Sequence, residues 1–327
     1  MHTLHICQGG IFCGVEDLSA ISEHLREPDT VVWLDLEAPD ADETALLHEE
    51  FGFHPLAIED AVRDHERPKV DSYDGYYLIV FYAAAYHNAA AADDTTPVID
   101  LRQVNLFVGK NFLVSIHRQP IDQLSRTIAR WYTPHSPLGS SVSGILHGLL
   151  DAIVDDYFSL MDRIADRIED LEDSIFKRFS DGAIEEIFGL KKHLLMLRRV
   201  AAPQRDVLNV LLRQDTAIFA PGDLIYMQDV YDHLVRVTET IDTYRDLLSS
   251  ALDSYLSLQG NQLNQLVKVL TLWSIILMST ALIAGIYGMN FAVMPELQQP
   301  WGYPFALGLM VAVAVGLALF FRSRKWW

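Results

Sequence analysis

The chain has 327 residues, half of them hydrophobic, and its 44 Asp and Glu against 25 Lys and Arg give a formal net charge of −19 at pH 7. A field of that sign repels nucleic acid and attracts cations, so nucleic acid is excluded as an expected partner. The cysteines, Cys7 and Cys13, have a spacing that matches no redox or zinc motif and that fits a reduced, cytosolic setting.

Residues 1–140 mix helix and strand signals and are expected to form a cytosolic α/β domain. Apolar residues 75–85 and 104–117 predict strands, and Gly109, Lys110 and Asn111 supply turn chemistry that folds the second run into a hairpin. Residues 87–97, rich in Ala and Asp, predict a loop.

From about residue 143 the pattern becomes helical, and residues 141–222 are expected to form a cytosolic helical region. Many carboxylates lie between Asp151 and Asp173, where the only cations are Arg163 and Arg167. A solvated helix face explains most of this acidic run.

Residues 224–288 contain no proline, and apolar residues recur three and four apart from Met227 to Leu258. This repeat predicts one packed helix of roughly 100 Å. A helix of that length is expected to project as a stalk, residues 223–268, whose simplest partners are copies of itself.

Two uncharged apolar runs predict transmembrane helices at 269–289 and 301–321. Lys268 precedes the first, a basic tail at 322–327 follows the second, and the connecting loop 290–300 has no Lys or Arg. The positive-inside rule therefore predicts that both termini lie in the cytosol and the loop outside.

Small or weakly polar residues follow one face of the first span. The face comprises Asn264, Val267, Thr271, Ser274, Met278, Ala281, Gly285 and Gly288, and traced backwards it includes Asp253. Such a stripe marks close helix packing in membranes, or lines a pore if several copies surround an axis. Hydropathy alone does not choose between these interpretations.

The first span ends in Gly288, Met289 and Asn290, followed by MPEL at 294–297 and WGYP at 301–304. With HPLAIED at 54–60 and DVYDH at 229–233, these motifs closely resemble the CorA family of magnesium channels. Mg²⁺ gives up its water reluctantly, so neutral amide oxygens of Asn290 suit a filter that holds the hydrated ion. Glu296, the acid of the loop, would concentrate cations at the mouth.

The resemblance implies a homopentamer with a funnel-shaped α/β cytosolic domain, long stalk helices and two C-terminal transmembrane helices in the cytoplasmic membrane. It implies that the first span lines the pore, that Gly288, Met289 and Asn290 form the selectivity filter, and that Asn264 forms an inner polar ring. Apolar rings at Val267, Leu270 and Met278 would gate by dewetting.

The resemblance also implies that Mg²⁺ is a regulatory ligand as well as the substrate, with no cofactor for catalysis. Asp229 matches one regulatory position, and Asp93 or Asp94 would supply a partner acid from the N-terminal domain. Histidines such as His147 and His233 are expected to be structural, because they lack the paired spacing of a zinc site.

Two alternatives stay open. A zinc transporter of the same superfamily shares Gly-Met-Asn, but that branch has a glycine-rich loop where this chain has MPEL. A membrane-anchored sensor or scaffold would use the stalk as a signalling coiled coil and conduct nothing. An enzyme is not expected, because the sequence has no P-loop, no GxSxG and no Ser/His/Asp arrangement.

Overall fold

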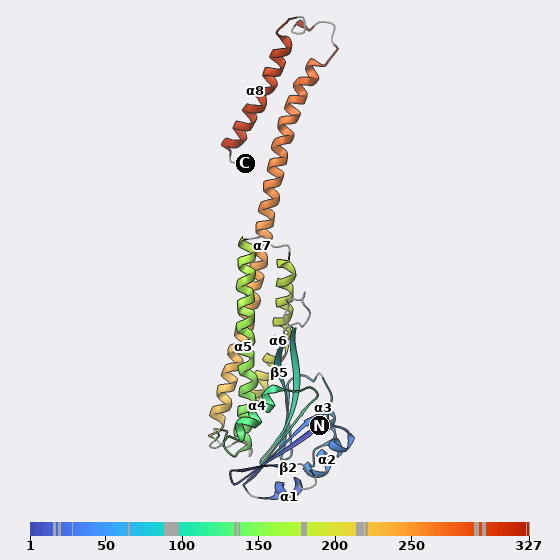
Figure 1. Ribbon diagram of the computed structural model, residues 1–327, viewed down its shortest axis with the longest axis vertical. Helices are drawn as coiled ribbons and strands as arrows, with labels where there is room; N and C mark the ends of the chain where they lie inside the picture. The colour runs from blue at the N-terminus through green and yellow to red at the C-terminus, as the bar shows by residue number, and fades with distance from the viewer. Residues whose placement is uncertain are drawn as a thin grey trace. The chain divides into compact units, whose positions relative to one another are not determined.

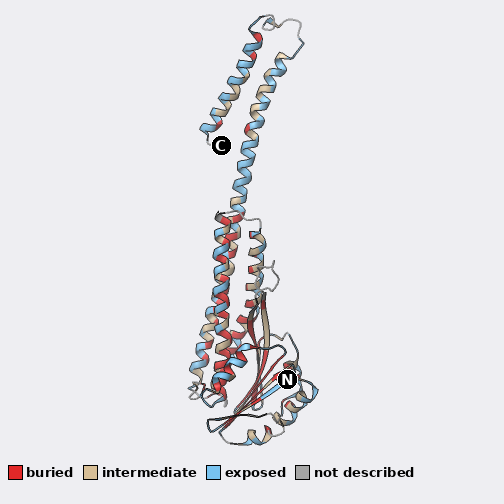
Figure 2. Cartoon of the chain, in the orientation of Figure 1, coloured by how far each residue is buried: buried red, intermediate tan, exposed pale blue. Residues whose placement is uncertain are grey.

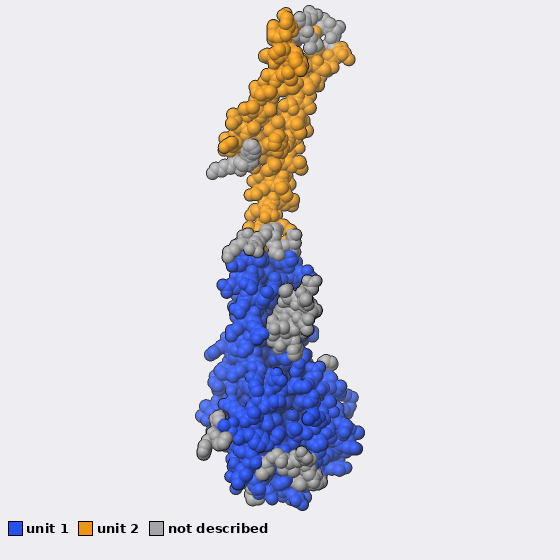
Figure 3. Space-filling view, in the orientation of Figure 1, with its two compact units in different colours: residues 1–249 blue, residues 250–327 orange. Residues whose placement is uncertain are grey.

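The computed structural model describes residues 1–15, 18, 21–27, 29–64, 66–87, 98–133, 136, 138–177, 182–213, 219, 222–290, 294–295, 299–324 and 326. The chain divides into two compact units, residues 1–249 and 250–327, which are coloured separately in Figure 3. The boundary falls inside one continuous helix, α7 (Leu224–Tyr287). The predicted long helix is therefore confirmed.

Unit 1 is built on a seven-stranded sheet of order β2-β1-β3-β7-β6-β5-β4 (Figure 1). Neighbouring strands are antiparallel except β3 and β7, which are parallel. The predicted strand at 75–85 and the predicted hairpin at 104–117 are confirmed as β5 and the β6–β7 pair. The strands are β1 (His2–Gln8), β2 (Ile11–Val15), β3 (Thr30–Glu37), β4 (Lys69–Tyr73), β5 (Tyr76–His87), β6 (Val98–Gly109) and β7 (Phe112–His117).

One face of the sheet carries three short helices, α1 (Ile21–Arg26), α2 (Ala41–Phe51) and α3 (Pro55–Val62). Helix α2 starts at a capping box formed by Asp40 and Glu43 and ends at Gly52, whose φ of 67° suits glycine. Beneath these helices Phe53 stacks on Phe107 with 4.1 Å between ring centroids. Alternate strand residues point to this core and to the opposite face.

The other face is covered by α4 (Asp122–Trp131), α5 (Val142–Lys177) and α6 (Ala183–Arg213). A buried polar network fixes α5 and α6 to strand β5. The Gln204 Oε1 accepts from the Tyr82 N–H at 3.1 Å, and its Nε2 donates to the Tyr157 hydroxyl at 2.9 Å. That hydroxyl donates to the Tyr82 carbonyl at 3.0 Å, so every member is satisfied.

Unit 2 contains the last part of α7 and helix α8 (Gly302–Ser323), which runs back beside it (Figure 1). Both helices are long and apolar enough to cross a membrane, and only 6% and 11% of their most apolar segments are buried. A core helix of a soluble protein would be mostly buried, whereas these are largely exposed in Figure 2. Both predicted spans thus lie on helices whose apolar surfaces suit lipid or further protein.

Candidate functional site

The predicted pore-lining face of α7 is exposed in the single chain. Of its large apolar residues, Val267 is 52%, Leu270 70% and Met278 72% exposed. Thr271 is half-buried, whereas the other small or polar members of the stripe are exposed: Asp253, Asn264, Ser274, Ala281, Gly285 and Gly288. Met289 and Asn290, which follow the stripe, are exposed as well. The second span, α8, therefore does not cover this face of α7. If the stripe were the surface that packs against α8, its residues would be buried.

The covered face of α7 is a different one. Leu272 is buried, and Ile276, Ser279 and Ile283 follow it at spacings of four, three and four as half-buried positions. Ala306 is buried on α8, which runs beside this part of α7 within unit 2 (Figure 1), so we infer that α8 covers this face of α7. With 3.6 residues per turn, the covered face lies roughly 160° around α7 from the stripe.

The external end of α7 changes geometry within the Gly-Met-Asn motif. The Gly288 N–H still donates to the Ala284 carbonyl at 2.9 Å, whereas the Met289 N–H donates to Ile286, three residues back, at 3.3 Å. Asn290 follows outside the helix, is exposed, and its side chain makes no hydrogen bond with the described residues. Its amide is therefore available, beside the negative end of the helix dipole, to a ligand from outside the chain.

Three of the predicted site residues, Glu296, Asp93 and Asp94, lie outside the described residues.

A cluster of possible metal ligands lies in unit 1, between α5 and the first turns of α7. One ligand atom each from Asp151, Asp229 and His233 lies within 4.8 Å of the others. The His233 Nε2 is 3.9 Å from an Asp229 oxygen, and the His233 ring meets Phe158 edge-on with 5.6 Å between centroids. Asp229 is 63% exposed, so an ion could enter from solvent. Two carboxylates and an imidazole suit a divalent cation.

Two ionisable side chains beside this cluster, Asp155 and His147, have pKa values that are shifted by burial and by the charges of the cluster. Burial, together with the charge of Asp151 one turn away, raises the pKa of Asp155. The opposite occurs at His147, where burial lowers the pKa although Asp151 and Asp229 act to raise it. A bound cation would relieve repulsion among these carboxylates.

Of this cluster, only Asp229 was predicted from the sequence as a metal ligand. Asp151 was assigned to a solvated acidic face and His233 to a structural role. The signal that could have found His233 is DVYDH at 229–233, since Asp229 and His233 are four residues apart and share a helix face. The pairing of Asp151 with that face depends on how α5 packs against α7, which no local pattern reveals.

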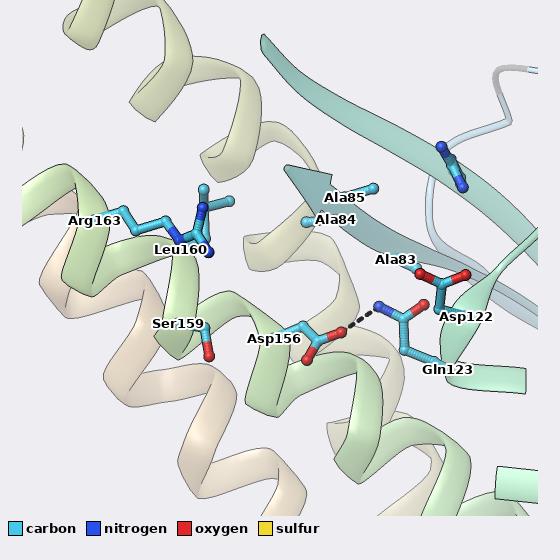
Figure 4. A pocket seen from close by; sticks show the side chains of 10 residues that line it. Ala83, Ala84, Ala85, Asp122, Gln123, Asp156, Ser159, Leu160 and Arg163 are labelled. Atoms are coloured by element: carbon cyan, nitrogen blue, oxygen red, sulfur yellow. Dashed lines mark hydrogen bonds between the residues drawn. The ribbon is translucent and has the colours of Figure 1, made fainter. Parts of the chain in front are cut away.

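A pocket of about 340 Å³ lies between β5, α4 and α5, lined by the small residues Ala83, Ala84 and Ala85 (Figure 4). The carboxylate of Asp156 accepts from the Gln123 Nε2 at 2.6 Å and pairs with Arg126. Because its carboxylate is already engaged, we assign no ligand to this pocket.

Comparison with known proteins agrees with the fold and the motifs. The sequence model of the CorA-like Mg²⁺ transporter protein family matches residues 28–324. The chain is 35% identical to the putative metal ion transporter YfjQ of Bacillus subtilis, over 93% of this chain and 92% of that one. It is also 35% identical to the cobalt/magnesium transport protein CorA of Thermotoga maritima, over 92% of this chain and 85% of the relative.

A solved structure with the same fold is the CorA magnesium transporter of Methanocaldococcus jannaschii. The TM-score is 0.84 at 24% identity, and the match covers 100% of this chain and 99% of that one. The family match over residues 28–324 and the two relatives at 35% identity establish that the chain belongs to the CorA-like Mg²⁺ transporter family.

Proposed function

We propose that five copies of this chain surround a pore in the cytoplasmic membrane through which Mg²⁺ enters the cell. Divalent cation transport is the activity of the family to which the chain belongs. The single observation that carries the pore is the position of the stripe on α7, exposed and roughly 160° from the face that α8 covers. The stripe is thus the face of α7 left for neighbouring copies and water.

In this assembly the Gly288, Met289 and Asn290 segments form the external filter. Asn290 presents neutral oxygens to a hydrated cation, and Glu296 raises the local cation concentration. Further in, Met278 narrows the pore with a thioether ring, and Leu270 and Val267 continue the apolar wall toward the amide ring of Asn264. Apolar rings of this kind close a narrow pore by losing water.

The acidic cluster of unit 1 supplies regulation in this proposal. Mg²⁺ bound at Asp151, Asp229 and His233 reports the internal concentration and favours the closed channel. Both termini lie in the cytosol in this arrangement, so that the cluster meets the internal ion. No catalytic residue or cofactor is required, because the ion is moved and not chemically changed.

Uptake of Mg²⁺, Co²⁺, Ni²⁺ and Zn²⁺ into vesicles that contain the purified protein tests the choice of ion. We expect Mg²⁺ to enter without a proton gradient, with Co²⁺ and Ni²⁺ as accessory substrates. Zinc uptake that requires a proton gradient, with no Mg²⁺ uptake, would favour the zinc-transporting branch. Failure of all four ions to enter would favour the non-conducting sensor or scaffold.

Cysteine accessibility tests the position of the stripe. A membrane-impermeant thiol reagent should modify Ser274→Cys in the open channel and spare Trp273→Cys, whose position is exposed but off the stripe. Both native cysteines, Cys7 and Cys13, are first replaced by alanine, so that only the introduced thiol can react. Equal modification of both positions would remove the basis for the pore face.

A further inference from the structure

Helix α6 has an exposed face that combines apolar and basic side chains, which we call the α6 face. Phe188 and Leu195 are 57% and 58% exposed, and Lys192 and Arg199 are exposed between and beyond them. At 3.6 residues per turn the four side chains lie within about 60° around the helix axis. Neither cation makes an ion pair or a side-chain hydrogen bond within the described part of the chain. Exposed apolar side chains gathered on one face mark a candidate contact surface.

A second exposed face, formed by α5 and α7, has the opposite charge, and we call it the α5–α7 face. Asp162 and Asp166 are four residues apart on α5, so they share one side of the helix, and both are exposed. Burial, and after it the charges of these two acids, raise the pKa of Tyr244 on α7, because both carboxylates lie near its hydroxyl. Leu247, three residues further along α7, is 42% exposed and adds apolar surface.

Two contacts between α5 and α6 show that both faces lie at the same height along the helices of unit 1. The Arg167 guanidinium pairs with Glu186, and the Gln204 Nε2 donates to the Tyr157 hydroxyl at 2.9 Å. The two helices are therefore antiparallel. The acids of the α5–α7 face lie between the two α5 partners, and the α6 face lies between the two α6 partners, so the acids and the α6 face are level.

Two contacts between α6 and α7 give the same height and a different direction. The Lys191 Nζ donates to the Ser249 Oγ at 2.8 Å, and the Arg198 Nε donates to Asp242 at 2.8 Å. Ser249 and Asp242 bracket the apolar pair of the α5–α7 face in the sequence, so that pair is level with the α6 face as well. At 3.6 residues per turn, the side of α7 that contacts α6 is roughly 150° around the helix from Tyr244. The two faces therefore open on different sides of unit 1.

We propose that the α6 face of each copy of this chain packs against the α5–α7 face of the next copy in a closed ring. A rotation about an axis along the helices keeps height unchanged, so it brings level faces of neighbouring copies together. The cations of one face then pair with the acids of the other, and the apolar side chains of both lose contact with water. This inference rests on the ring of copies in the proposed function, and not on which ion is carried.

The charges also decide the kind of contact. Each face carries charges of a single sign, so two α6 faces, or two α5–α7 faces, repel each other. A two-fold dimer built from either face alone is therefore disfavoured. Contact between unlike faces is heterologous, and a rotation that closes makes it a ring in which every copy uses both faces.

Disulfide cross-linking of the full-length protein tests this contact. In a chain whose Cys7 and Cys13 are replaced by alanine, Leu195→Cys on the α6 face is combined with Leu247→Cys on the α5–α7 face, and the thiols are oxidised. Denaturing electrophoresis should show a ladder of covalent oligomers, because each copy is bonded to two neighbours. The matched control combines Leu195→Cys with Glu49→Cys, an exposed position on α2, and should give no ladder. Absence of a ladder from the first pair, or an equal ladder from the control, would overturn the proposal.

Charge reversal in the same cross-linking chain tests the pairing of the two faces. K192E/R199E places like charges opposite each other and should reduce the cross-linked fraction roughly tenfold. Addition of D162K/D166K to that variant should restore the ladder, which also shows that the first loss was not a failure to fold. An unchanged ladder in K192E/R199E, or no recovery when all four charges are reversed, would overturn the proposal.

Mg²⁺ uptake is measured on the same preparations before oxidation. An intact ladder without uptake would contradict the transport function and leave the contact between copies standing. Uptake without a ladder would overturn the contact and leave the transport function standing.

Discussion

The metal cluster of unit 1 gives a thermodynamic prediction that can be checked without a transport assay. The D151N/D229N variant removes two negative ligands and leaves His233. A site of two carboxylates and an imidazole, with one carboxylate 63% exposed, is expected to bind Mg²⁺ with a Kd of about 1 mM. At about 20 mM Mg²⁺ a site of that affinity stabilises the folded protein by about 1.8 kcal/mol. For a unit of this size that corresponds to a rise in Tm of roughly 4–7 °C.

Which of the two proteins, wild type or D151N/D229N, has the higher Tm should depend on whether thermal unfolding is measured in EDTA or in Mg²⁺. In EDTA the variant is expected to be at least as stable as wild type, because it removes the repulsion that helps raise the pKa of Asp155. In Mg²⁺ wild type gains the full shift and the variant gains little. A Mg²⁺-induced rise in Tm that occurs in wild type and not in the variant indicates a specific site, because general screening of a chain with a net charge of −19 would raise the Tm of both proteins.

The matched control is D162N/D170N, which neutralises two exposed acids of the same helix away from the cluster. Its Mg²⁺ shift should equal that of wild type. If D151N/D229N shifted as much as wild type, or the control lost the shift equally, the cluster would not be the regulatory site.

Gln204→Leu removes the acceptor of the buried Tyr82 N–H and the donor to the Tyr157 hydroxyl, so it should lower the free energy of unfolding by about 2–4 kcal/mol. Denaturant unfolding measures this loss, and a loss below about 0.5 kcal/mol would contradict the network. Burial lowers the pKa of His117, but its bond to Asp35 and that charge outweigh burial and leave the pKa raised above 6.5. The stabilisation by the His117–Asp35 pair is therefore complete below about pH 6.5 and is lost as the pH rises through the folded pKa of His117. In His117→Gln, Tm should depend less steeply on pH in this range, and an unchanged slope would refute the role of the pair. Met278→Ser should hydrate the narrow apolar ring and increase Mg²⁺ uptake at high internal Mg²⁺, whereas unchanged uptake would remove Met278 from the gate.

The long helices could be predicted because the sequence patterns that indicate them extend over many residues. The apolar repeat along 224–288 and the two uncharged runs predict α7 and α8 closely, and Gly109 to Asn111 correctly locate the β6–β7 turn. The same periodicity could not say which face of α7 meets α8, because Trp273, Leu277 and Leu282 are as apolar as the covered Leu272.

The metal cluster shows a second limit of the sequence. Asp151 and Asp229 are far apart in the chain, and only the packing of α5 against α7 brings them together. A run of carboxylates on one helix looks the same whether one member faces a ligand or all face water. Asp229 was identified through the family resemblance, His233 could have been found from its spacing of four residues to Asp229, and Asp151 needed the three-dimensional structure.

The most direct test of the account is Mg²⁺ uptake by purified protein in vesicles, with wild type beside Asn290→Ala and a control, Val311→Ala, on the exposed side of α8. We predict that Asn290→Ala loses Mg²⁺ selectivity or uptake while Val311→Ala behaves as wild type. Mg²⁺ uptake by Asn290→Ala with unchanged rate and selectivity would contradict a filter of amide oxygens at the end of α7.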